Sequence, residues 1–199
     1  MKAAPLLVAL LLAGCGPLVQ IGGNSAPAAS LLTLSATTPP APYAGPASAK
    51  ATLGVEIPTV PLTLQTLRLP VTTSATETTY LVGASWAEQP NRQFQRLLAD
   101  TLAARGVAVI DARQARTPPA RSLTGSLATF GLDVTDPANP VVRVRYDAQL
   151  SSIQAAPTVM LRRFDTAEPV AEQTPVAVAA ALNRAANRTA LEVAGWIGS

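Results

Sequence analysis

Hydrophobic and polar residues alternate along the chain between positions 142 and 150. Apolar members on one side of an extended backbone and polar members on the other are typical of a strand in a half-buried antiparallel sheet. The predicted inward residues are Val142, Val144, Tyr146, Ala148 and Leu150, and the outward ones are Arg143, Arg145, Asp147 and Gln149. Strand-like segments at 122–134 and 158–165 flank this one, with a turn at 135–140 (TDPANP) before it. We therefore predict an antiparallel meander.

Two other segments follow a period close to 3.6 residues, which predicts amphipathic helices. The first begins near Pro90 and ends at Gly106, and its apolar stripe consists of Phe94, Leu97, Leu98, Thr101 and Leu102. The second has Thr174 as its N-cap and Pro175 in its first position. Its stripe consists of Val178, Leu182, Ala185, Thr189, Val193 and Trp196.

Shorter apolar segments at 53–58, 64–71 and 78–83 predict further strands. Segment 107–111 (VAVID) directly follows the first helix and predicts a buried strand, which completes a strand–helix–strand unit. The architecture that uses all these elements is an α/β (α+β) two-layer sandwich. It has a mixed sheet that contains the meander, with two main helices packed on one face.

The beginning of the chain has the layout of a secretory signal, with Lys2 followed by an apolar run that ends in small residues. The twelve residues 3–14 would span about 18 Å as a helix, which is too short for a hydrocarbon core of about 30 Å. We interpret residues 1–14 as a signal peptide. The residues Leu12, Ala13, Gly14 and Cys15 resemble a bacterial lipobox, in which the signal is removed and the cysteine carries lipid.

Cys15 is the only cysteine of the chain, and histidine is absent from the sequence. No internal disulfide can form, and the chain offers no histidine to join a metal site or to activate a thiolate. A secreted chain with a coincidental cysteine is the alternative. We expect lipid attachment at Cys15, and Gly16 in place of aspartate indicates the outer membrane by the usual sorting rule. The domain would then face the periplasm.

Low-complexity sequence follows Cys15. Residues 16–52 carry one charged residue, Lys50, and are rich in Ala, Pro, Ser and Thr, which predicts little buried surface. We expect residues 15–29 to be the lipidated cysteine with its flexible tether, and residues 30–199 to be a single domain. Segment 30–35 (SLLTLS) is a candidate short strand at the start of that domain, and a flexible loop is expected at about 36–52.

Composition argues against nucleic acid as a partner. The formal net charge is +3, only 14% of residues are charged, and aromatic residues make up 4%. The arginines are dispersed, and few aromatic side chains are available for base stacking. The outward row of Arg143 and Arg145 with Arg162 or Arg163 could meet a partner or acidic headgroups, but a solvated sheet face is the favoured interpretation.

Catalytic chemistry finds little support. Gly83-Ala84-Ser85-Trp86-Ala87 occupies the position of a nucleophile elbow between a strand and a helix, but its last glycine is replaced and no histidine can act as base. We interpret Ser85 and Trp86 as a structural corner, with the indole covering the edge of the core. The carboxylates are scattered. We predict no catalytic residues, no metal site and no cofactor, and a protein that is not an enzyme.

The order of these motifs resembles a known family. The lipobox is followed by LLTLS, by a tyrosine-ended strand, by Trp86-Ala87-Glu88 with Pro90 opening a helix, and by an RFD strand end before an alanine-rich helix that closes on Trp196-Ile197. This series resembles the ABC-type transport auxiliary lipoproteins, the PqiC-like family, over essentially the whole mature chain.

The resemblance implies an adaptor subunit in an MCE-type system that moves lipids or other hydrophobic molecules between membranes. It implies an MCE-domain protein as partner, an outer-membrane anchor and a homo-oligomer. The alternative is a stand-alone lipoprotein that binds lipid or assembles outer-membrane components without an ABC partner, which would need an apolar pocket within the sandwich.

Overall fold

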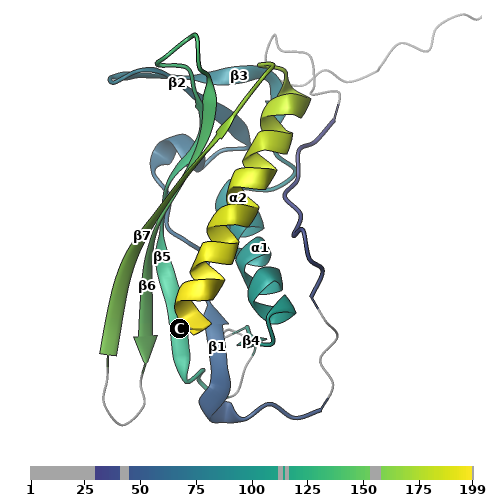
Figure 1. Cartoon of the computed structure of the whole chain (residues 1–199), viewed down its shortest axis with the longest axis vertical. Coiled ribbons are helices and arrows are strands. Elements are labelled where there is room, and N and C mark those ends of the chain that lie inside the picture. Colours follow the sequence, from purple (N-terminus) through teal and green to yellow (C-terminus); the bar gives the residue numbers. More distant parts are fainter. Residues whose placement is uncertain (1–29, 41–44, 112–113, 115–116, 153–157, 199) are drawn as a thin grey trace, which may run out of the picture.

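A computed structural model describes residues 30–40, 45–111, 114, 117–152 and 158–198 of the chain. These residues form one seven-stranded mixed sheet with two main helices (Figure 1). The elements in chain order are β1 (Thr52–Val55), β2 (Arg68–Ser74), β3 (Glu77–Ser85), α1 (Pro90–Ala104), β4 (Ala108–Ile110), β5 (Arg121–Asp133), β6 (Val141–Ser152), β7 (Thr158–Pro169) and α2 (Pro175–Gly198). Two short 3₁₀ helices, η1 (Ala49–Ala51) and η2 (Leu62–Leu64), precede β1 and β2.

The strand β5 lies at the centre of the sheet and joins its parts. On one side β5 pairs antiparallel with β6, and β6 pairs antiparallel with β7, as the predicted meander requires. On the other side the first residues of β5 pair in parallel with β1, and its last residues, Leu132 and Asp133, pair in parallel with β2. The sheet therefore forks, with β4 beside β1 on one branch and β3 beside β2 on the other.

Both helices cover the same face of the sheet (Figure 1). The alternation predicted for β6 is confirmed, because its five inward side chains are buried while Arg143 and Gln149 are exposed. The predicted two-layer α+β sandwich is likewise confirmed. Helix α1 begins at Pro90, and Gly106 follows its end with a φ of +81°, a left-handed conformation that glycine adopts easily. Thr174 Oγ1 accepts a hydrogen bond from Ala177 N at 3.3 Å, as expected of an N-cap.

Aromatic side chains fill the space between the sheet and the helices. The Phe94 and Tyr146 rings meet edge to face with centroids 5.3 Å apart, and the Trp86 and Phe130 centroids lie 5.5 Å apart. The prediction that Trp86 covers the edge of the core is wrong, because its side chain is completely buried inside the cluster. Burial also raises the pKa of Tyr146, whose hydroxyl donates a hydrogen bond to the Thr124 carbonyl at 3.1 Å.

The strand predicted at 107–111 differs from expectation. It is reduced to the three residues of β4, which are half-buried because β4 lies at an edge of the sheet. β4 pairs with β1 and not with β3, so the strand–helix–strand unit spans the two branches of the fork. The apolar run alone could not distinguish an edge strand from a central one.

Residues 32–37 form an extended segment that we call the strap. Segment 30–35 was a candidate strand, but the strap makes a single parallel bridge, from Leu32 to Trp86. Leu32 N donates to the Ser85 carbonyl at 2.8 Å, and Ala87 N donates to the Leu32 carbonyl at 2.9 Å. The start of the domain is thereby joined to the corner between β3 and α1.

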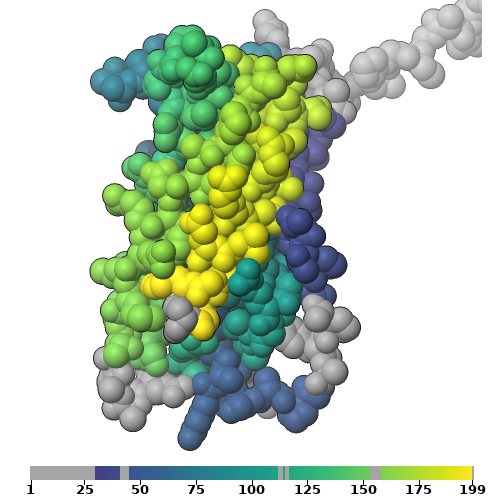
Figure 2. All heavy atoms as spheres, viewed as in Figure 1, coloured from purple at the N-terminus to yellow at the C-terminus, as the bar shows by residue number. Residues whose placement is uncertain are grey.

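Side-chain amides of both helices hold the rest of the strap. Gln93 is buried, and its Oε1 accepts a hydrogen bond from Leu34 N at 2.7 Å. Asn187 Oδ1 accepts from Thr37 N at 2.7 Å, and Asn187 Nδ2 donates to the Ser35 carbonyl at 2.9 Å. The strap, purple in Figure 2, lies along the flank of α2. It has no sheet ladder, so these amides provide its backbone partners.

We expect Asn187→Ala to release the strap without unfolding the domain. The change removes three hydrogen bonds of a buried amide, which should lower the free energy of unfolding by about 1–3 kcal/mol. Amide hydrogen exchange should accelerate over residues 32–40. Asn183→Ala, which removes one strap contact, is the matched control and should have a smaller effect. If amide hydrogen exchange over residues 32–40 is unchanged in Asn187→Ala, the Asn187 amide does not hold the strap.

Gly125→Ala should disrupt the β5–β6 pair. A Cβ at Gly125 would lie 2.4 Å from the Asp147 carbonyl oxygen and 2.7 Å from the Tyr146 ring. Such overpacking should cost about 2–3 kcal/mol in urea denaturation. Gly195→Ala in α2 is the control, because nothing lies within 4 Å of its added methyl, and it should leave stability equal or higher. Equal stabilities of the two variants would refute this packing constraint.

Candidate anchor and docking surfaces

The predicted lipid-attachment residue, Cys15, lies outside the described residues, as do the rest of segment 1–29. The structure shows where that segment joins the fold, which is at the strap, beside β3 and α2. Among the helices of the described residues, none has the length and apolarity needed to cross a membrane.

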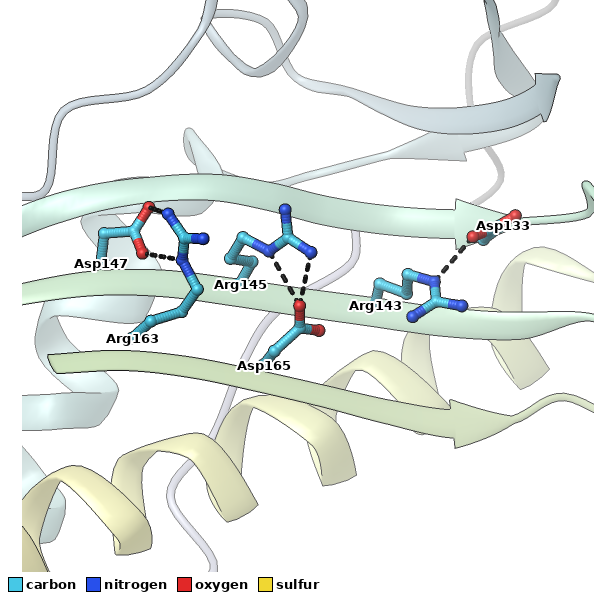
Figure 3. A network of polar contacts seen from close by, with 6 residues as sticks. All are labelled: Asp133, Arg143, Arg145, Asp147, Arg163 and Asp165. Atoms are coloured by element: carbon cyan, nitrogen blue, oxygen red, sulfur yellow. Dashed lines mark hydrogen bonds and ion pairs between the residues drawn. The ribbon is translucent and has the colours of Figure 1, made fainter. Parts of the chain in front are cut away.

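The outer face of the sheet carries a row of ion pairs (Figure 3). Arg143 Nε lies 2.7 Å from Asp133 Oδ2, Arg145 Nη2 lies 2.6 Å from Asp165 Oδ2, and Arg163 Nε lies 2.5 Å from Asp147 Oδ1. These six residues come from β5, β6 and β7, and the pairs connect neighbouring strands. The predicted outward row therefore includes Arg163, whereas Arg162 lies apart from it.

The arginines and aspartates on this face neutralise one another's charges. Partial burial opposes ionisation of Asp133, but hydrogen bonds from Thr135 and the Arg143 guanidinium hold its pKa below the ordinary value. The hydrogen bond to Asp147 raises the pKa of Arg163. Exposed pairs of this kind add little stability, but they leave the arginines of the row already matched. This favours the solvated-face interpretation over an acidic-headgroup site.

The first half of β7 presents a different surface. Val159, Met160 and Leu161 are 64%, 47% and 70% exposed, although they are consecutive large apolar residues. Arg162 follows them, and its guanidinium lies 5.2 Å from the centre of the Phe164 ring. Sequence reasoning missed this surface, because an apolar run in a meander is typical of a buried strand. Met160 and Arg162 share the face of β7 on which Phe164 is buried, so their exposure marks where the helix layer stops covering the strand. Val159 and Leu161 lie on the opposite, outer face of the sheet with Arg163.

The Ser85 corner is a junction of backbone hydrogen bonds between β3 and the strap. Ser85 is the last residue of β3, and its carbonyl accepts the Leu32 hydrogen bond. The sequence supplies no histidine as a base. Within the part of the chain that the structure describes, no group of three or more His, Cys, Asp or Glu side chains is arranged for a metal ion.

Two of the hollows on the described surface bear on the lipid-binding alternative. One lies on the sheet beside Asp147, Gln149 and Leu161, with both arginines of segment 162–163 in its wall. The other lies between η2 and β5, where threonines form much of the lining. Both open to solvent and both have polar side chains in their walls. Neither resembles the enclosed apolar cavity that a lipid-binding sandwich would need.

Comparison with known proteins identifies the family of the chain. The fold is similar to the crystal structure of a Xanthomonas campestris protein of family DUF330, with 20% identity, a TM-score of 0.70, and coverage of 85% of this chain and 94% of that one. It is also similar to the crystal structure of an uncharacterized protein, with 16% identity, a TM-score of 0.63, and coverage of 74% and 92%.

No curated protein matches the sequence. A family model described as the ABC-type transport auxiliary lipoprotein component matches residues 32–194, which extend from the strap to the last turns of α2. That range contains the meander, both helices and the forked sheet. The chain therefore belongs to the ABC-type transport auxiliary lipoprotein family.

Proposed function

We propose that the protein is an auxiliary subunit of an MCE-type ABC transport system that moves lipids or other hydrophobic molecules between membranes. It is anchored in the outer membrane, faces the periplasm and acts as an adaptor without catalytic activity. The family match over residues 32–194 carries the proposal, together with a lipid-attachment motif that ends at Cys15, shortly before the strap.

The position of the strap explains how an anchor would hold the domain. Removal of residues 1–14 leaves Cys15 at the new N-terminus, followed by a tether of about 14 residues. A flexible chain of that length has an end-to-end distance of roughly 20 Å. Because Asn187 and Gln93 fix the strap to the helices, the tether would attach at one defined end of the domain.

The partners follow from the same proposal. The domain would receive an MCE-domain protein that arrives from the inner membrane, and several copies would form a homo-oligomer around the contact. The scattered carboxylates and the absence of histidine from the sequence support an adaptor role over an enzymatic one.

Cys15→Ser should detach the protein from the outer membrane. A serine hydroxyl cannot accept the thioether-linked lipid, and several acyl chains contribute about 0.8 kcal/mol per buried methylene to anchoring. Membrane fractionation should show loss from the outer-membrane fraction, while circular dichroism of the purified domain should be unchanged. A variant that stays in the outer membrane in wild-type amounts would contradict lipid attachment at Cys15.

Crosslinking in intact cells should recover an MCE-domain protein with the wild-type chain. The measurement is affinity purification from crosslinked membranes followed by mass spectrometry, with an unrelated outer-membrane lipoprotein as control. Recovery of co-purified lipid by native mass spectrometry, without any MCE-domain protein, would support the stand-alone lipid-binding alternative and contradict the proposal.

A further inference from the structure

The first half of β7 is unusually open for a strand that carries large apolar residues. All six residues from Thr158 to Arg163 are exposed, so both faces of the strand contact solvent there. Val159 and Leu161 project to one face of the strand and Met160 to the other, because side chains alternate. Single exposed apolar residues are ordinary, but three in succession on one strand are typical of an interaction site.

The main chain of β7 is also open along one edge. In the described part of the structure β7 pairs with β6 and with no other strand. An edge strand offers a row of N–H and C=O groups to another extended chain, and natural proteins usually protect such edges with charges or proline. Here the arginines begin only at residue 162, so segment 158–161 is an apolar edge without charges of its own.

Arg162 supplies a charge that this edge can use. Its guanidinium rests over the Phe164 ring, at the margin of the apolar segment. Arg163, by contrast, is paired with Asp147 on the outer face of the sheet. An incoming strand with an acidic residue opposite Arg162 would gain a charge-assisted contact at the end of an apolar one.

The fold places this edge away from the strap. Thr158 pairs with Ser152 at the hairpin end of β6 and β7, whereas Pro169 at the other end of β7 leads to the start of α2. Pro175 lies beside Gly83, close to the corner that receives the strap. Figure 1 shows the start of β7 and the start of α2 at opposite ends of the longest axis of the molecule. Twelve strand residues span about 40 Å.

A second copy of this chain fits the edge less well than a different protein. Two identical strand edges pair in the antiparallel direction, which would send the two straps to opposite ends of the joined sheet. If the strap end of each domain is turned toward the membrane, as the proposed anchor favours, one strap of such a pair lies far from it. A tether of roughly 20 Å cannot cover that separation, because the strand alone spans about 40 Å.

We infer that segment 158–163 of β7 is the docking edge for an extended segment of the MCE-domain partner. That segment adds a strand to the sheet, places apolar side chains against Val159 and Leu161, and carries an acidic residue toward Arg162. This inference rests on the proposed function and adds to it the surface that meets the partner. It assigns the membrane and the partner to opposite ends of the domain.

Site-specific photocrosslinking tests the inference in the full-length, membrane-anchored protein. A photoreactive phenylalanine replaces Val159 or Leu161 in cells that also contain a tagged MCE-domain protein. Leu62 and Val82 are matched control positions, because both are apolar and more than 80% exposed but lie on η2 and β3. Adducts with the tagged protein should be at least tenfold stronger from β7 than from the controls, and Arg162→Glu should weaken them severalfold.

Three results would overturn the docking edge while leaving the proposed function intact, provided that general crosslinking still recovers the MCE-domain protein. They are adducts from Leu62 or Val82 but not from β7, adducts of β7 with a second copy of the chain, and equal adducts with and without Arg162→Glu. If no crosslinking recovers the MCE-domain protein, the proposed function fails, and the docking edge fails with it.

Discussion

Backbone pairing along β5 is the constraint on which the rest of the structure depends. β5 hydrogen-bonds to β6 along nearly its whole length, and to β1 and β2 at its two ends. Gly125 and Gly131 permit this, because a Cβ at either position would lie within 2.5 Å of a backbone oxygen on a neighbouring segment. The twin branches, the meander and the face that the helices cover are all positioned through this one strand.

Local patterns predicted the elements, and long-range contacts decided how they combine. The alternation in β6, the Thr174 cap and the Pro90 start were all legible because they depend on neighbouring residues. The fork of the sheet was not, because two parallel pairings along one strand leave no local signal. Gln93 and Asn187 resemble ordinary polar helix positions in the sequence, yet the strap uses their amides as backbone partners.

On the candidate surfaces, too, local patterns predicted some positions, while other features depend on long-range contacts. The outward position of Arg143 and Arg145 followed from strand period, but their pairing with aspartates required the registers of β5, β6 and β7. The exposure of Met160 and Arg162 could not be predicted, since it depends on where the helix layer ends, whereas Val159 and Leu161 lie on the outer face of the sheet. The outer face of the sheet is polar and its charges are paired, whereas the edge at the start of β7 is apolar. We therefore place the candidate contact with a partner at the β7 edge.

The proposed adaptor has a direction, with its tether at the strap end and its docking edge at the hairpin end. Fluorophores on cysteines introduced by Val176→Cys or Val159→Cys test this in the lipidated protein, because the natural cysteine is consumed by the lipid. Val176 lies in the first turn of α2, beside the strap end. Quenchers on lipid headgroups should quench the label at 176 severalfold more than the label at 159. Equal or reversed quenching would contradict the orientation.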